Sequence, residues 1–310
     1  MDSVPARFIE SVLQISPWPR SLDPTRKLPG RWGQLEEVYS KKRGVLHLTY
    51  RARDRNEGSF KYRLNGFAHI KTRTLSREVV KEMSKSIQEI HCFVLPSMRF
   101  GFYEETDLEE DDDTWELLLR LEAPVKILMF HTSYELDSKK ASVSKSFQLF
   151  RTFTSLDMNS IDQAPVQLME DILSSGRLQS ITIREPVPAT LPASAWVDCF
   201  FSESCSTLSV NFQDSAVIPK ILEQWKKTDS RALASHKIIE TPSIPDASVI
   251  GMTTIQMESA ESAEVIKKVE SKIAGRINIR SLHLIDHPVD PSSKIYVVLQ
   301  VCGGYVMWFD

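Results

Sequence analysis

The sequence has few of the residues that mark a specialised class of protein. Its 310 residues include four cysteines, Cys92, Cys199, Cys205 and Cys302, and contain no Asn-x-Ser/Thr sequon. The wide cysteine spacing fits neither a disulfide framework nor a zinc site built from short-spaced ligand pairs. Reduced, mostly buried thiols are therefore expected, as in a cytosolic (cytoplasmic) or nuclear protein.

Long hydrophobic runs and an excess of one charge are also missing. No window approaches the ~18 uninterrupted apolar residues of a membrane span. The apolar stripe that begins at Phe8 follows Arg7 and runs into Pro17, so it does not resemble a secretory signal. The formal net charge of −3 lacks the basic excess typical of nucleic-acid binding. Membrane and nucleic-acid partners are therefore not expected.

The common signatures of catalysis are absent from the sequence. There is no glycine-rich phosphate loop, no His-Glu-x-x-His, no Gly-x-Ser-x-Gly and no Cys-x-x-Cys. Ser142-Val143-Ser144-Lys145 matches Ser-x-x-Lys without its companion motifs. His91, His236 and His283 lie in or beside expected strands, at what we interpret as equivalent repeat positions, and we expect them to be structural. We predict no enzyme, and no catalytic residue, metal or cofactor.

One dense acidic run, residues 104–113, reads Glu-Glu-Thr-Asp-Leu-Glu-Glu-Asp-Asp-Asp. Blocks of like charge repel one another and favour solvated loops. A calcium-binding EF-hand loop needs an internal glycine and a terminal glutamate, and neither is correctly placed here. The run is predicted to be a solvated loop.

Helical and extended periodicities alternate along the rest of the chain. Ser76 opens a helical stripe that includes Ile87 and Ile90 and runs into a β-branched stretch at 91–95. Later stripes are centred on residues 168–173, 218–225 and 266–273, and Gly176 is placed to end the first of these helices. The expected strands lie near 91–95, 126–131, 178–183, 207–212, 236–240 and 281–285.

This alternation predicts an α/β fold built from irregular helix–strand repeats. Units of about 25 to 35 residues are too small to bury their own apolar faces, so they must stack. Because a helix connects each strand to the next, we expect the strands to lie side by side in a mostly parallel, leucine-rich-repeat-like sheet. Residues 294–309 differ, because two strand-like runs flank Gly303-Gly304 and predict a β-hairpin that caps the array.

The N-terminus carries a family resemblance. Val4-Pro5, Phe8-Ile9 and Val12 resemble the opening of an F-box, Leu-Pro followed by spaced hydrophobic residues. Ser21-Leu22-Asp23-Pro24 resembles the loop before its second helix, and Trp32 stands near its late tryptophan.

The wider chain is similar to a nematode-expanded family of F-box-related proteins that open with Met-(Asp/Asn)-x-Val-Pro. Members carry an α/β region related to the FTH (FOG-2 homology) domain, and residues 217–226 resemble its Leu-x-Gln-Trp-Lys helix. The resemblance implies a small helical F-box-like segment at residues 1–45 and an FTH-like α/β domain at residues 46–310.

The same resemblance implies an adaptor. F-box segments dock on a Skp1-type linker of a cullin ubiquitin ligase, and the C-terminal region recruits an unidentified target protein. The expected partner-binding residues are Val4, Pro5, Phe8, Ile9, Val12 and Trp32. Pro5 would start the helix, and the apolar residues would enter a groove on the linker. Alternatively, the segment only caps the first repeat of a binding scaffold that has no ligase connection.

Overall fold

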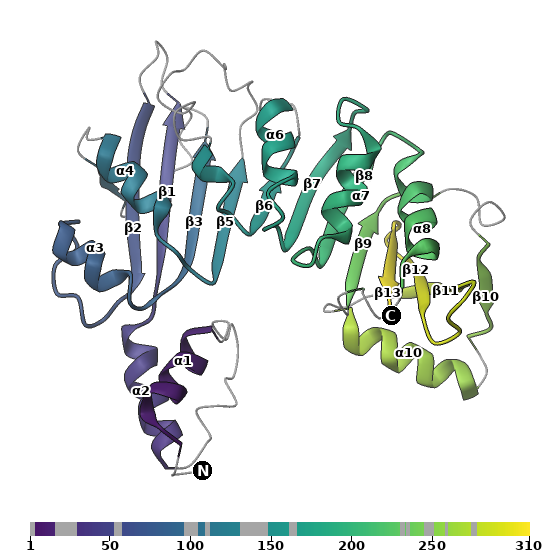
Figure 1. Ribbon diagram of the computed structural model, residues 1–310, viewed down its shortest axis with the longest axis horizontal. Helices are drawn as coiled ribbons and strands as arrows, with labels where there is room; N and C mark the ends of the chain where they lie inside the picture. Colours follow the sequence, from purple (N-terminus) through teal and green to yellow (C-terminus); the bar gives the residue numbers. More distant parts are fainter. Residues whose placement is uncertain are drawn as a thin grey trace. The chain divides into compact units, whose positions relative to one another are not determined.

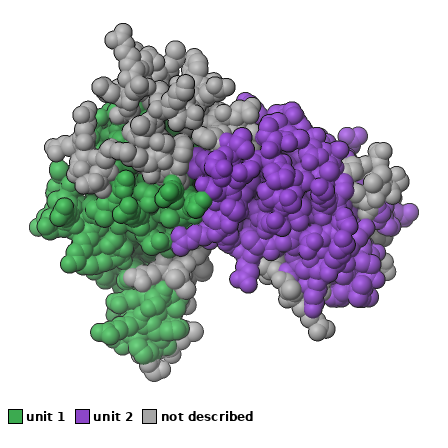
Figure 2. All heavy atoms as spheres, turned by 45° about the horizontal axis from the view of Figure 1, so that its top comes forward, with its two compact units in different colours: residues 1–155 green, residues 156–310 purple. Residues whose placement is uncertain are grey.

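The structure is a computed structural model, and its elements are labelled in Figure 1. It describes residues 4–15, 30–52, 58–95, 105–108, 112–130, 148–160, 166–229, 233, 236–244, 251–257, 260–273 and 278–310. The chain divides into two compact units, residues 1–155 and residues 156–310, which Figure 2 colours separately. Each unit combines a mixed β-sheet with helices.

Unit 1 (residues 1–155) starts with two helices and continues as a sheet. Its elements are α1 (Ala6–Ile15), α2 (Arg31–Lys42), β1 (Gly44–Ala52), β2 (Gly58–Gly66), α3 (Arg77–Met83), β3 (Ile87–Leu95), β4 (Thr106–Asp107), α4 (Asp112–Arg120) and β5 (Val125–Phe130). The strand order is β5-β3-β1-β2-β4. β1, β3 and β5 are parallel, whereas β2 is antiparallel to both β1 and β4.

Side-chain alternation gives the unit 1 sheet a helix-covered face and an opposite face. Tyr50 of β1 lies against Phe60 of β2, with ring centroids 5.1 Å apart, and Phe60 lies 4.4 Å from Trp115 of α4. Since successive residues of a strand point to opposite sides, His47 of β1 and its neighbour His91 of β3 lie on the other face. The hairpin of β1 and β2 was not expected from the sequence.

The helical run that starts at Ser76 is shorter than its apolar stripe predicts. The Ser76 hydroxyl accepts a hydrogen bond from the Val79 amide at 3.3 Å and caps α3 as expected. The helix ends at Met83, and Ile87 and Ile90 belong to β3, so their helical assignment is wrong. Both residues pair with β1 in parallel register, and this pairing outweighs a helical period that β-branched residues support poorly.

Unit 2 (residues 156–310) alternates helices and strands before it turns antiparallel, and its first strand begins one residue before the boundary. Its elements are β6 (Ser155–Met158), α6 (Val166–Leu173), β7 (Ser180–Val187), α7 (Ala193–Phe201), β8 (Thr207–Phe212), α8 (Val217–Lys227), β9 (Lys237–Thr241), β10 (Thr253–Ile255), α10 (Ala260–Lys272), β11 (Ile279–Asp286), β12 (Lys294–Gln300) and β13 (Tyr305–Phe309). The strand order is β10-β11-β12-β13-β9-β8-β7-β6.

The parallel centre of unit 2 agrees with the sequence, and its C-terminal part does not. β7, β8 and β9 are parallel, and Gly176 after α6 has the expected left-handed φ of 66°. The strand at 281–285 was placed in this array, but it lies in β11, which is antiparallel to β10 and β12. The β12–β13 hairpin exists, but it lies between β9 and β11 and does not end the sheet.

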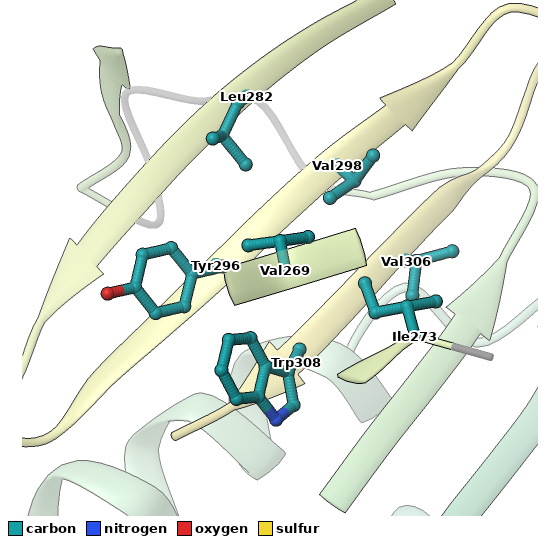
Figure 3. Close-up of a cluster of buried hydrophobic side chains, with 7 residues drawn as sticks. All are labelled: Val269, Ile273, Leu282, Tyr296, Val298, Val306 and Trp308. Carbon is teal, nitrogen blue, oxygen red and sulfur yellow. The ribbon is translucent and has the colours of Figure 1, made fainter. Parts of the chain in front are cut away.

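The position of the hairpin follows from what β13 contacts on its two faces. Phe309 contacts Phe200 of α7 and Trp225 of α8, with ring centroids 5.0 and 6.3 Å apart. Trp308 points to the opposite face, where it stacks on Tyr296 at 5.2 Å and joins the cluster shown in Figure 3. That cluster consists of Val269 and Ile273, from α10 and the residue after it, and Leu282, Tyr296, Val298, Val306 and Trp308 of β11–β13. β13 therefore packs between α7 and α8 on one side and α10 on the other.

Truncating Trp308 should cost unit 2 a large part of its stability. Trp308 is fully buried, so Trp308→Ala leaves a cavity between the sheet and α10, which typically costs about 3–5 kcal/mol. Urea unfolding followed by far-ultraviolet circular dichroism measures the loss. Val301→Ala, at a side chain that is 61% exposed, is the control and should stay within about 0.5 kcal/mol. A Trp308→Ala loss below about 1 kcal/mol would contradict this role.

Candidate functional site

α1 begins where the sequence places the start of the F-box-like segment. The Pro5 carbonyl accepts hydrogen bonds from the amides of Phe8 and Ile9, at 3.0 and 3.3 Å. Val4 is half-buried and Pro5 is exposed. Residues 16–29, which include the Ser21–Pro24 motif, lie outside the described residues.

The apolar residues of α1 form two neighbouring stripes with different surroundings. Ile9 and Leu13, spaced i and i+4, are 0% and 1% exposed. Phe8 and Val12 form a second i, i+4 stripe, in which Phe8 is 56% exposed and Val12 is half-buried. One stripe is therefore occupied by packing, and the other presents a phenyl ring to solvent.

The second helix brings the last expected site residue to the same segment. α2 packs against α1 and contains Trp32, which is half-buried. Within the described residues, the buried Trp32 Nε1 has no hydrogen-bond partner. Val38 on α2 is 50% exposed. The structure thus places Phe8, Ile9, Val12 and Trp32 on one pair of helices, and Val4 and Pro5 lie directly before α1.

A buried arginine that the sequence did not single out ties this pair to the sheet. Arg43 lies between α2 and β1, is 2% exposed, and donates from Nη2 to the Leu13 carbonyl at 2.6 Å. Its guanidinium also lies 5.9 Å from the ring centre of Tyr39. An arginine after two lysines looks like a surface residue in the sequence, and no local pattern reveals this contact.

Two buried lysines hold the amino ends of strands and were likewise missed. Lys126 of β5 donates to the carbonyls of Leu119 and Leu121 and to the Thr152 hydroxyl, at 2.7, 3.0 and 2.8 Å. Lys237 of β9 donates to the carbonyls of Phe200, Ser202 and Cys205, at 2.7, 2.8 and 2.6 Å. An ammonium group has three N–H donors, so both lysines are saturated and neither has a lone pair for chemistry.

The expectation that His91, His236 and His283 occupy equivalent repeat positions is wrong. His91 lies in parallel β3 and contacts Glu89 Oε2 at 2.7 Å through Nε2. His236 precedes β9 and stacks on Trp308. His283 lies in antiparallel β11, and its nitrogens contact the Thr254 and Ser281 hydroxyls at 3.1 and 3.0 Å. Within the described residues, His283 thus meets hydroxyls on both sides, and no carboxylate orients it as a base.

The acidic run is partly folded, in contrast to the predicted solvated loop. Glu105 accepts a hydrogen bond from the Thr49 hydroxyl at 2.8 Å and pairs with Arg51 at 2.9 Å. Thr106 and Asp107 form β4, where Asp107 pairs with Lys61 at 3.0 Å, and residues 112–113 begin α4. Arg51 of β1 and Lys61 of β2 thus offset part of the repulsion among the acidic side chains, which was the basis of the loop prediction.

Among the described residues, the cavities of unit 2 include two with different linings. One, of about 820 Å³, lies between the end of α8 and the turn before β12. Its His287 donates from Nε2 to the Trp225 carbonyl and accepts the amides of Val289 and Asp290 at Nδ1, so the ring is fully used by the fold. The other, of about 590 Å³, is lined by residues of β7, β8 and β9 and by the β12–β13 turn, and is called the β7–β9 groove. Neither cavity is predicted by the sequence analysis.

Comparisons with protein-family models, with curated proteins and with solved structures found no match. Among the described residues, no group of three His, Cys, Asp or Glu side chains is arranged to hold a metal ion. No described helix is both long enough and apolar enough to cross a membrane.

Replacing Lys237 should destabilise unit 2. Lys237→Met keeps the length of the side chain but leaves three carbonyls without their donor, which should cost about 3 kcal/mol. Lys227→Met, at a side chain that is 65% exposed, should change stability by less than about 0.5 kcal/mol. Equal urea midpoints for Lys237→Met and the parent chain would show that the cost of burying the ammonium cancels its hydrogen bonds.

His47 should make the protein less stable in mild acid. Burial, with nearby His91 and Arg63, lowers the His47 pKa from 6.5 to about 4, although Glu89 opposes this shift. Between these values the unfolded chain binds a proton that the folded chain does not, so the free energy of unfolding falls as pH drops from 6.5 to 4. The partial exposure of His47 reduces the full linkage to about 2 kcal/mol.

Urea unfolding at pH 6.5 and pH 4.5 tests this linkage. His47→Gln keeps an acceptor for the Asn65 amide, 2.8 Å from the imidazole Nε2, and should show a smaller loss between the two pH values. His236→Gln removes an exposed imidazole elsewhere and should retain the parent pH dependence. Parallel curves for the parent chain and His47→Gln would contradict the assignment.

Proposed function

We propose that this protein is a binding adaptor, in which α1 and α2 dock on a Skp1-type linker and the α/β region recruits a target protein. The observation that carries the proposal is the contrast between neighbouring residues of α1, with Ile9 fully buried and Phe8 56% exposed. A helix already anchored by one stripe needs no exposed phenylalanine for its own packing. An exposed aromatic anchor suits a contact in which a helix enters a groove.

The residues of the F-box-like pattern divide between two roles in this proposal. Ile9 packs within the segment, and Arg43 joins the Leu13 carbonyl to the start of β1. Phe8, with Val12 one turn further on, forms the surface offered to the linker. The division into a segment of residues 1–45 and a domain of residues 46–310 remains part of this proposal.

A second candidate is a binding scaffold without a ligase connection, in which α1 serves only as a cap. Two observations favour it: the buried stripe of Ile9 and Leu13, and the Arg43 hydrogen bond to the Leu13 carbonyl. Both are contacts that a cap needs. Only the Phe8 stripe separates the two candidates, since capping leaves it without a role.

We further propose that this function is binding and involves no catalysis of its own. Lys126 and Lys237, the most deeply buried cations among the described residues, are saturated by hydrogen bonds. The Cys92 thiol has its pKa raised by burial to about 12, which disfavours a nucleophilic thiolate. These observations support the binding proposal, and a cytosolic or nuclear location remains part of it.

Phe8→Asp should abolish binding to a Skp1-type linker protein while leaving the fold intact. The side chain is mostly exposed, so a carboxylate there should change the free energy of unfolding by less than about 1 kcal/mol. In a groove on the linker, the same carboxylate would be buried without a partner, which costs several kcal/mol of binding energy. Binding of purified linker, measured by calorimetry beside urea unfolding, gives both quantities.

Two further variants complete this experiment. Val289→Asp, at a side chain that is 82% exposed in unit 2, should leave linker binding unchanged. Ile9→Asp places a charge at a fully buried position and should destabilise the helical segment by several kcal/mol. No binding by the parent chain would leave the scaffold function, and a loss of stability in Phe8→Asp would favour capping.

A further inference from the structure

The β7–β9 groove lies where the sheet of unit 2 changes its helical cover. α7 and α8 pack on the face that contains Phe309, and α10 packs on the opposite face over β11–β13. The strand direction also changes at β9, which is parallel to β8 and antiparallel to β13.

A row of polar side chains crosses the floor of this groove. Thr182 of β7 pairs with Ser209 of β8, which pairs with Glu240 of β9. Paired residues of neighbouring strands point to the same face, and their alternate neighbours Leu208 and Ile239 are buried on the other face. Thr182 and Ser209 are half-buried and Glu240 is exposed, so the row is open to solvent.

The polar groups of this row are free to bind a ligand. Within the described residues, the side chains of Thr182, Ser209 and neighbouring Asn211 take part in no hydrogen bond, and Glu240 takes part in no ion pair. Hydroxyl and amide groups both donate and accept, as the backbone of an extended peptide requires. With strands about 4.8 Å apart, the row spans about 10 Å, which is the length of three extended residues.

Charge decides which peptide fits the groove. Arg184, the cation of the lining, is engaged by Asp157, with Nη1 to Oδ1 at 2.5 Å and Nη2 to Oδ2 at 3.1 Å. A third contact joins Arg184 to the Asn159 side chain at 3.3 Å. With that cation neutralised, Glu240 leaves the groove with a negative charge that favours a positively charged partner.

We propose that the β7–β9 groove binds an extended segment of a protein, with a lysine or arginine of that segment paired to Glu240. The hydroxyls of Thr182 and Ser209 hold the backbone of the segment, and the carboxylate selects its side chain. This inference deepens the proposed adaptor function. It rests on that proposal in one respect only, namely that the extended segment belongs to the recruited target protein.

A peptide library with a fixed central residue tests the selection. Nonapeptides with a central Lys, Arg, Gln or Glu and randomised flanking positions are arrayed, and the purified full chain is applied. The parent chain should retain Lys and Arg peptides at least about tenfold better than Gln peptides. Glu240→Lys should invert the preference, so that peptides with a central Glu bind best. Glu223→Lys, at an exposed position of α8, is the control and should keep the preference of the parent chain.

An exposed thiol allows the site to be checked independently. Cys302 lines the groove and is exposed, whereas Cys92, Cys199 and Cys205 are buried, so a thiol-reactive fluorophore should label the rim selectively. Titration of a selected Lys peptide should change its emission, and Thr182→Val with Ser209→Ala should weaken binding about tenfold. Titration into the unlabelled chain by calorimetry excludes an effect of the label itself.

The outcomes separate this inference from the linker function. No enrichment of basic peptides, or the same enrichment in Glu240→Lys, would overturn the groove proposal whatever the linker experiment shows. Selection by Glu240 in a chain that does not bind the linker would retain the groove and discard the ligase connection. A preference of the parent chain for peptides with a central Glu would also overturn the groove proposal.

Discussion

The ammonium groups buried at the amino ends of β5 and β9 are the constraint on which the parallel parts of the sheet depend. The last carbonyls of a helix have no hydrogen-bond partner within that helix, and they need one where the chain turns toward the next strand. Lys126 meets this need at the end of α4, and Lys237 meets it after α7. A neutral side chain could not donate to three acceptors, and each ammonium is further stabilised by a phenyl ring, Phe153 at 5.0 Å and Phe200 at 5.4 Å. The cost of burying each charge is thus offset by contacts that exist in only one strand register.

The register imposed by Lys237 reaches the surface of unit 2 through side-chain alternation. Because Lys237 faces α7, Ile239 faces the same way, and Glu240 must point to the opposite side. β13 then pairs with β9 and places Phe309 on the lysine face and Trp308 beneath α10. α10 packs over β11–β13 on the same face as Glu240, and the floor of the β7–β9 groove lies on this face beside it. A buried lysine and an exposed glutamate three residues later are therefore two consequences of one strand orientation.

Sequence reasoning succeeded where local pattern and packing agree. α8 was predictable because Ile218, Ile221, Leu222 and Trp225 form one apolar stripe, and all four are buried. It failed where pairing partners decide, as at Ile87 and Ile90, whose helical spacing gave way to pairing with β1. The strand at 281–285 was found, but its direction depends on β12, a distant segment. Arg43, Lys126 and Lys237 could not be recognised, because a cation in a short segment looks solvent-exposed until its carbonyl partners are known. The row of Thr182, Ser209 and Glu240 needed the register of three strands.

The N-terminal helix shows why one sequence pattern permitted both docking and capping. Phe8 and Ile9 are adjacent, and their stripes lie about 100° apart on the helix, so both belong to one broad apolar surface in the sequence. Such a surface is wider than one packed neighbour needs, and the structure uses only the part formed by Ile9 and Leu13. Capping and docking therefore do not compete for the same residues, although the sequence pattern assigns all of them to one role. Ile9, Leu13 and the Arg43 hydrogen bond hold this helix in place in the chain alone. Pre-ordering of this kind lowers the entropic cost of presenting Phe8, so capping by Ile9 and Leu13 would favour the proposed docking on a linker.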